Sequence, residues 1–136
     1  MLSIIMLKQL FEILKFPLLV LVAHVLATVL NWYAIDYFDK LMHTLGGMSI
    51  AVSAFSTYTL LHKRKWVGTN HSLVVAVTVV AVVVFAAVAW EWMEFLIDTF
   101  AGSRMQISLT DTMGDLLAGT LGGTLISLTR LLLPKK

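Results

Sequence analysis

The sequence contains no cysteine, and only two of its 136 residues are proline. The absence of cysteine excludes disulfide bonds and thiolate metal ligands. Charged residues are also scarce, at 13% against about 25% in typical soluble domains. The formal net charge is only +2, and no basic patch interleaved with aromatic residues occurs, so nucleic-acid binding is not expected. Hydrophobic residues make up 59% of the chain, which predicts one integral membrane domain over residues 1–136.

Four long apolar segments predict four transmembrane helices, because a helix needs about 20 mostly apolar residues to cross the hydrocarbon core. The expected spans are residues 17–35, 39–61, 72–98 and 112–133. Pro17 suits the first turn of a helix, and Asp111 is expected to cap the fourth span. The predicted fold class is therefore all-α, a four-span antiparallel transmembrane helix bundle. Residues 2–15, which place Lys8, Glu12 and Lys15 on one face, favour either an interfacial amphipathic helix or an extension of the first span.

The basic residues are distributed unevenly between the two ends of the expected spans. Eight of the ten lie on the side of the two termini: Lys8, Lys15, Lys63, Arg64, Lys65, Arg130, Lys135 and Lys136. Only Lys40 and Arg104 lie on the other side. The positive-inside rule therefore predicts that both termini are cytoplasmic in the inner, or plasma, membrane.

Small residues are frequent in the second and fourth spans, where they allow helices to approach closely. In the fourth span Gly119 and Gly123 are four residues apart. Tight packing is the preferred interpretation of this pair, and a homo-oligomer with these glycines at its interface is the alternative. In the first span His24 stands alone among apolar residues, and a buried, hydrogen-bonded core histidine is favoured over a ligand.

Seven of the eight acidic residues lie on the outer side of this topology: Asp36, Asp39, Glu91, Glu94, Asp98, Asp111 and Asp115. The chain passes this level three times, so residues far apart in sequence are expected at one depth. Acids at the ends of transmembrane helices are costly and usually have a partner or a function. If the helix faces converge, mutual repulsion prevents all the carboxylates from ionising. Protonation, pairing with Lys40 or Arg104, or a bound cation would relieve it.

Carboxylates with one histidine form a hard, oxygen-rich site that suits a divalent metal ion, Mg²⁺, Mn²⁺ or Zn²⁺. The candidate ligands are Asp39, His43, Glu94, Asp111 and Asp115. Glu91 or Asp98 is the candidate general base, and the guanidinium of Arg104 could bind a substrate phosphate. The alternative interpretation is hydrogen bonding between helices at an acidic outer rim.

Three segments of the sequence carry a resemblance to known membrane proteins. They are Asp39–Gly47 (DKLMHTLGG), Trp90–Phe95 (WEWMEF) and Asp111–Asp115 (DTMGD). Together they resemble the VanZ-like membrane proteins and, more closely, the bacterial inner-membrane proteins of the YjdF type. VanZ-like chains tend to have Gln at the position of Glu94 and Asn at that of Asp115. The resemblance implies a helical membrane protein with clustered polar motifs and implies no particular reaction.

The leading functional hypothesis is a metal-dependent hydrolase or transferase that acts at the outer face of the bilayer on a lipid or lipid-linked phosphate. The second hypothesis is transport of a cation or proton through the acidic cluster. The third is a non-catalytic structural or regulatory membrane protein, in which the acids hold helices together.

Overall fold

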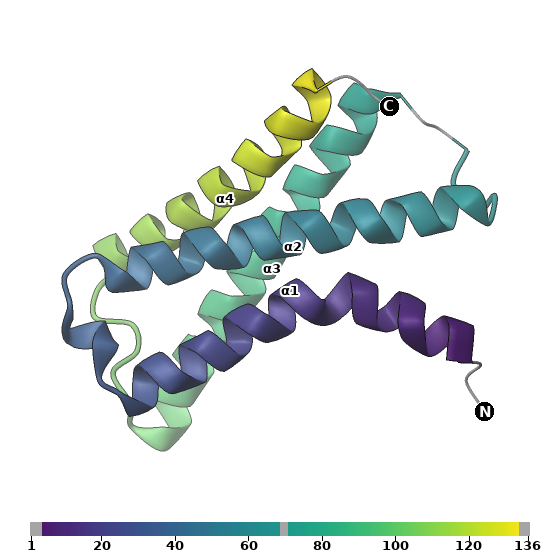
Figure 1. The fold of residues 1–136 in the computed structure, drawn as a ribbon. Coiled ribbons are helices and arrows are strands. Elements are labelled where there is room, and N and C mark those ends of the chain that lie inside the picture. Colours follow the sequence, from purple (N-terminus) through teal and green to yellow (C-terminus); the bar gives the residue numbers. More distant parts are fainter. Residues whose placement is uncertain (1–3, 69–70, 134–136) are drawn as a thin grey trace.

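The computed structural model describes residues 4–68 and 71–133. Within these residues it contains four long α-helices, one short 3-10 helix and no strand. The long helices are α1 (Ile4–Val29), α2 (Phe38–Lys63), α3 (Ser72–Ala101) and α4 (Leu109–Leu132), and η1 (Trp32–Ala34) lies between α1 and α2. Consecutive long helices run in opposite directions (Figure 1), so the predicted all-α antiparallel bundle is confirmed.

Three helices in the described part of the chain are long and apolar enough to cross a membrane. They comprise Met6–Val29, Phe38–Lys63 and Ser72–Ala101. Helix α4 is not among these three but has 24 residues, and at about 1.5 Å per residue it is about 36 Å long. That length exceeds the hydrocarbon thickness of about 30 Å.

Helix α1 differs from the expected arrangement at its start. The sequence suggested that Pro17 begins the first span, whereas α1 is continuous from Ile4 and contains Pro17 in its interior. The extension of the first span, rather than a separate interfacial helix, is what the structure contains. Proline lacks a backbone N–H, so it cannot bond the carbonyl of Ile13 four residues earlier. The hydroxyl of Ser53 on α2 donates to that carbonyl at 2.6 Å instead, and α1 is visibly bent (Figure 1).

Helices α2 and α4 pack closely because glycines lie where they cross. A Cβ atom added at Gly47 would overlap the backbone of Gly119, and one added at Gly122 would overlap the backbone of Thr44. A Cβ atom added at Gly123 would overlap the side chain of Val83 on α3. Gly119 and Gly123 are both buried within the chain, in agreement with the interpretation that they serve tight packing.

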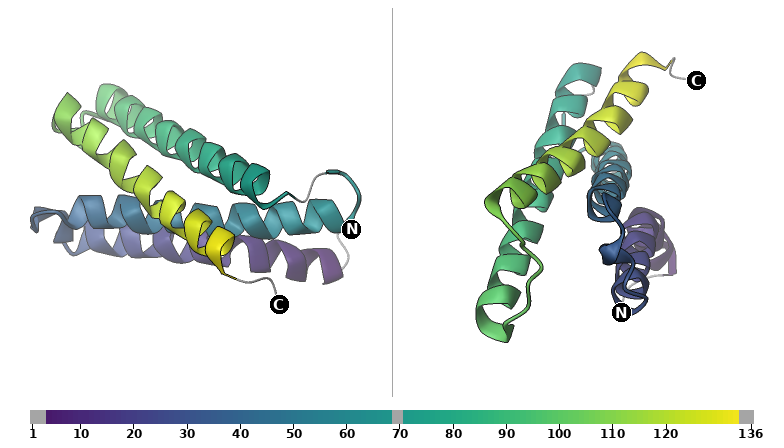
Figure 2. Two further views of the ribbon diagram at one scale, coloured as in Figure 1. Left: turned by 90° about the horizontal axis from the view of Figure 1, so that it is seen from above. Right: turned by 90° about the vertical axis from the view of Figure 1, so that its left-hand side faces the viewer.

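The core is small and lies between α2, α3 and α4. Its fully buried members are Ala51, Val79 and Val83. Helix α1 packs against α2 and η1, and in the described residues its backbone does not come close to α3 or α4, although the ring of His24 meets that of Trp90 on α3. In the right-hand view of Figure 2, α1 lies beside α2 and apart from α3 and α4. Most of the bundle's apolar surface is therefore left exposed, as expected for a protein surrounded by lipid.

Candidate functional site

The site lies at the end of the bundle where α1 leads into α2 and α3 leads into α4. Three helices contribute to it: Asp39, Lys40 and His43 from α2, Glu91 and Glu94 from α3, and Asp111 and Asp115 from α4. The α2 residues lie in its first two turns, and the α4 residues in the first two turns of that helix. The expected convergence of acids at one depth is thus present in the structure.

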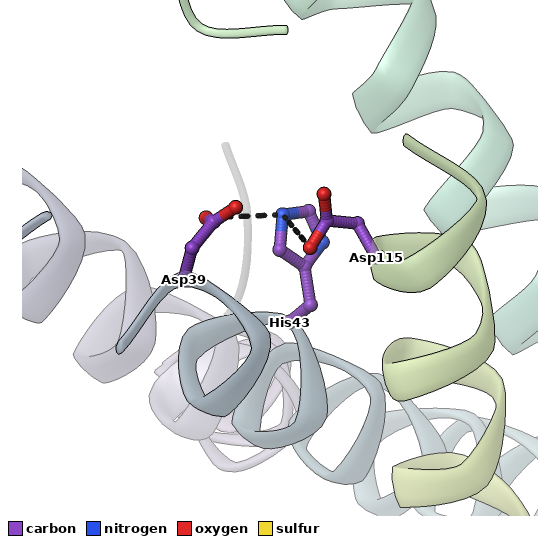
Figure 3. A group of neighbouring side chains, drawn as sticks. All are labelled: Asp39, His43 and Asp115. Atoms are coloured by element: carbon purple, nitrogen blue, oxygen red, sulfur yellow. Dashed lines mark ion pairs between the residues drawn. The ribbon is translucent and has the colours of Figure 1, made fainter. Parts of the chain in front are cut away.

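His43 is the centre of this cluster, and only 10% of its side chain is exposed. Its Nε2 atom lies 3.5 Å from Oδ1 of Asp39 and 3.6 Å from Oδ1 of Asp115 (Figure 3). Its Nδ1 atom lies 3.9 Å from Oε1 of Glu91. The imidazole therefore has carboxylates from all three helices on its two nitrogens.

Lys40 supplies the positive charge nearest to these acids. Its Nζ atom lies 2.5 Å from Oδ1 of Asp111, 2.8 Å from Oδ1 of Asp115 and 3.6 Å from Oδ2 of Asp39. Pairing with Lys40, one of the three expected routes for relieving repulsion, is therefore realised. One ammonium group is shared among three carboxylates from α2 and α4.

The glutamates of α3 are held by side chains that the sequence did not single out. Nε2 of Gln106 donates to Oε2 of Glu91 and to the Glu91 backbone carbonyl, both at 2.9 Å. Nε1 of Trp90 donates to Oε1 of Glu94 at 2.7 Å. An i, i+4 spacing could have suggested the second pair. The pair of Gln106 and Glu91 is separated by fifteen residues, so no helical spacing in the sequence could have suggested it.

Two buried carboxylate oxygens accept no hydrogen bond from the described residues: Oε1 of Glu91 and Oδ1 of Asp115. Nζ of Lys40 is close to the latter, but it approaches outside hydrogen-bond geometry. Both oxygens lie near the His43 ring, one on each nitrogen. A buried polar atom without a donor is costly, so these atoms mark a place where a cation or proton would be stabilised.

Two groups of side chains have the geometry to hold a metal ion. One is Asp39, His43 and Asp115, and the other is His43, Glu91 and Glu94. In each, one ligand atom per residue lies within 4.8 Å of the others. Four of the five expected ligands belong to these groups. The fifth, Asp111, pairs with Lys40, and Glu91, expected as a base, joins the second group.

Asp98 and Arg104 lie outside this cluster. Asp98 binds the loop that follows α3, because its carboxylate accepts hydrogen bonds from the Ser103 hydroxyl and from the backbone N–H groups of Met105 and Gln106. Arg104 is exposed in that loop and forms no ion pair with any described residue. At the start of α4 the N-cap is Ser108, whose side chain accepts from the Asp111 N–H, so the expectation that Asp111 caps this helix is wrong.

His24 and Tyr33 extend the polar groups towards α1. Nδ1 of His24 is 2.6 Å from the Tyr33 hydroxyl, and its ring meets Trp90 edge to face. Burial, with help from the carboxylates of the site, raises the pKa of Tyr33 to about 12, so this hydroxyl stays protonated and can donate. The interpretation of His24 as a hydrogen-bonded core residue agrees with these contacts.

Comparison with protein-family models identifies the family of the chain. The model of a family described as "Predicted membrane protein (DUF2238)" matches residues 5–136. No curated protein and no solved structure matches the chain significantly.

Proposed function

The chain belongs to the DUF2238 family of predicted membrane proteins, and we propose that it is a membrane enzyme that binds a divalent cation around His43. Its substrate would be a lipid or lipid-linked phosphate, hydrolysed or transferred at the membrane surface. The observation that supports this proposal best is the pair of buried carboxylate oxygens of Glu91 and Asp115 on the two sides of His43, which accept no hydrogen bond from the described residues, although that of Asp115 lies 2.8 Å from the ammonium of Lys40.

The charge balance of the site favours a cation. Five carboxylates lie in the cluster, namely Asp39, Glu91, Glu94, Asp111 and Asp115, and Lys40 is the only lysine or arginine that pairs with any of them in the described residues. Glu91, Glu94 and Asp115 are buried, and isolated buried carboxylates are strongly disfavoured. A divalent ion offsets this excess and uses oxygen and imidazole ligands already in place.

The residues would divide the work as follows. Asp39, His43 and Asp115, or His43, Glu91 and Glu94, would hold Mg²⁺, Mn²⁺ or Zn²⁺, with Asp111 keeping Lys40 in position. When bound, such an ion polarises a phosphoryl oxygen and lowers the pKa of water. Glu91 is the better candidate for general base, because both oxygens of Asp98 are engaged with the loop. Arg104 would bind the phosphate through its planar guanidinium.

The same residues could serve a structural role, and Lys40 is the observation that favours this second candidate. An ammonium group shared by three carboxylates links α2 to α4 without any metal ion. The two functions differ in what a divalent ion does to the protein. A structural cluster has its cation already, whereas a metal enzyme gains stability from added metal.

We propose that this site lies at the outer face of a plasma membrane with both termini in the cytoplasm, because eight of the ten basic residues lie on the side of the termini. Transport is less favoured, because the core on the other side of the cluster consists of Ala51, Val79 and Val83.

The experiment is metal analysis of protein purified without chelator, followed by an assay for phosphate release from a lipid diphosphate in mixed micelles. Wild-type protein should retain about one divalent ion per chain, and His43→Ala should lose it. The control is Asp36→Ala, an exposed acid outside the cluster. If metal-free wild-type protein gains no stability from Mg²⁺, Mn²⁺ or Zn²⁺, the metal site is contradicted and the structural role is the remaining explanation.

A further inference from the structure

A cavity of about 260 Å³ lies directly beside the site, between α1, α2 and α3. Pro17 and Leu21 of α1 line one wall, and Ala86 and Trp90 of α3 line the opposite wall. Gly46 of α2 lies in the wall between them. Ligand pockets are usually larger but share this mostly apolar lining with a few polar groups.

The polar groups of the cavity are those of the site. Asp39, His43 and Glu94 line it, together with the hydrogen-bonded pair of His24 and Tyr33. The cavity is therefore amphipathic, with carboxylates and imidazoles at the site and aliphatic side chains along the rest of its length. A ligand that fits it has a polar end and a hydrocarbon part.

The cavity is open towards the lipid rather than enclosed by protein. Its two walls belong to α1 and α3, whose backbones do not approach each other closely in the described chain, although the rings of His24 and Trp90 meet edge to face across the gap. Both helices are long and apolar enough to span a membrane, so the space between them lies at the depth of the bilayer. At that depth the surrounding medium is hydrocarbon, and a lipid chain is the molecule available to fill it.

We infer that this cavity admits one hydrocarbon chain of a bilayer lipid sideways between α1 and α3. The lipid's polar group then reaches Asp39, His43 and Glu94. The role of that polar group as substrate rests on the proposed function, whereas entry of the chain does not. The substrate class that follows is an amphipathic lipid that enters from the bilayer, rather than a water-soluble phosphate ester.

Gly46 offers a direct way to block the cavity. An added Cβ atom there meets no atom within 4 Å, so Gly46→Leu should fill the cavity without displacing a helix. Ala86→Leu fills it from the opposite wall. Ala89→Leu is the matched control, because Ala89 is exposed on the same helix as Ala86 and is not part of the lining.

Trp90 lies in the cavity wall and can report on lipid entry by fluorescence. Trp32, Trp66 and Trp92 are 46%, 71% and 69% exposed, so they are replaced with Phe to remove their signal. The protein is placed in phosphatidylcholine vesicles with bromine in the upper part of one acyl chain. Bromine should quench Trp90, Gly46→Leu should at least halve the quenching, and Ala89→Leu should leave it unchanged.

The inference would be overturned if bromine quenched Trp90 equally in Gly46→Leu and in the unblocked protein. It would also be overturned if Ala89→Leu lost as much quenching as Gly46→Leu. Native mass spectrometry of chains that keep all four tryptophans provides a second measurement. It should find one bound phosphatidylcholine in the wild type and Ala89→Leu, and none in Ala86→Leu. If the protein binds lipid but no metal ion, the proposed metal enzyme is contradicted and lateral entry of lipid is supported. If it binds a metal ion but no lipid, lateral entry is contradicted and the metal site is supported.

Discussion

The hydroxyl of Ser53 donates a hydrogen bond to the backbone carbonyl of Ile13 at 2.6 Å. That carbonyl lies four residues before Pro17, so the helix itself offers it no donor. A side chain of α2 thus replaces a backbone hydrogen bond of α1. In hydrocarbon an unsatisfied carbonyl costs several kcal/mol, so this contact allows a proline inside α1.

We predict that Ser53→Ala destabilises the protein by about 0.6 kcal/mol and by no more than about 1.7 kcal/mol, the average and the maximum for hydrogen bonds between membrane helices. In a Pro17→Ala background the same change should cost much less, because replacing the proline restores the missing backbone N–H group. Thermal unfolding in detergent of the four variants of this cycle measures the coupling. Ser56→Ala is the control, since Ser56 bonds to its own helix. Equal costs in the two backgrounds would contradict this role for Ser53.

Adjacent glycines on α2 should respond in opposite ways to one added methyl group. Gly47→Ala places a Cβ atom on the backbone of Gly119, so it should cost about 1–3 kcal/mol or more by overpacking. Gly46→Ala meets open space and should be neutral or stabilising by up to about 1 kcal/mol, because Ala is the better helix former. Melting temperatures of the two variants in one detergent test this. A tolerated Gly47→Ala would mean that α2 and α4 are further apart.

The sequence was sufficient to predict the helices and the grouping of the acidic residues at one end of the bundle. Long apolar runs indicated the bundle, and the i, i+4 spacing placed Asp39 beside His43 and Asp111 above Asp115 on their helices. Helix ends were less accurate, since α1 passes through Pro17 and the N-cap of α4 is Ser108. A proline inside a helix depends on a partner from another helix, and no local pattern reveals Ser53 as that partner.

Contacts between helices were the part that the sequence could not supply. Periodicity gives the face of a residue on its own helix but not the rotation of one helix against the next. Lys40 was one of two candidate counter-ions, and only the packing of α2 on α4 brings it to Asp115. Gln106 reaches Glu91 because Asp98 fixes the intervening loop. The role of Asp98 in holding this loop therefore could not be predicted from the spacing between Asp98 and Glu94.

The orientation of the bundle is open to direct measurement. Eight of the ten basic residues lie on the side of the termini, so we predict that a reporter active only in the cytoplasm works when fused after Lys136. A reporter active only outside the cytoplasm should fail at the same position and work when inserted after Arg104. The reverse pattern would place the His43 cluster on the cytoplasmic side.

Arg104 provides a test of the loop that follows α3. It is exposed and unpaired among the described residues, so Arg104→Ala should leave the free energy of unfolding within about 0.5 kcal/mol of wild type. If Arg104 binds the substrate phosphate, release of phosphate from a lipid diphosphate should fall. Arg104→Lys should recover only part of the activity, because a point charge does not replace a planar, bidentate donor. A loss of stability in Arg104→Ala would instead assign it a structural role.

Lys40 and a divalent ion would neutralise the same acids, and this competition separates the proposed metal site from a structural cluster. Lys40→Gln leaves Asp39, Asp111 and Asp115 without their ammonium partner. In chelator the variant should be less stable than wild type by about 1–3 kcal/mol, because Lys40 is partly exposed but buried Asp115 loses its ammonium partner. Added Mn²⁺ should restore most of this loss if the site binds cations. At a hundredfold excess over Kd, binding to the folded state contributes about 2.7 kcal/mol.

The same measurement shows whether the ligands act as one unit. His43→Ala and Asp115→Ala should each abolish stabilisation by Mn²⁺, and the double variant should lose nothing further, because residues in one network do not contribute additively. A structural cluster requires the opposite behaviour. Asp115→Asn, which keeps the size of the side chain but removes its charge, would then be neutral or stabilising in chelator, and Mn²⁺ would not rescue Lys40→Gln. Those two results together would exclude the metal site, because Glu91 and Asp115 would then be accommodated by protonation and by the ion pair with Lys40.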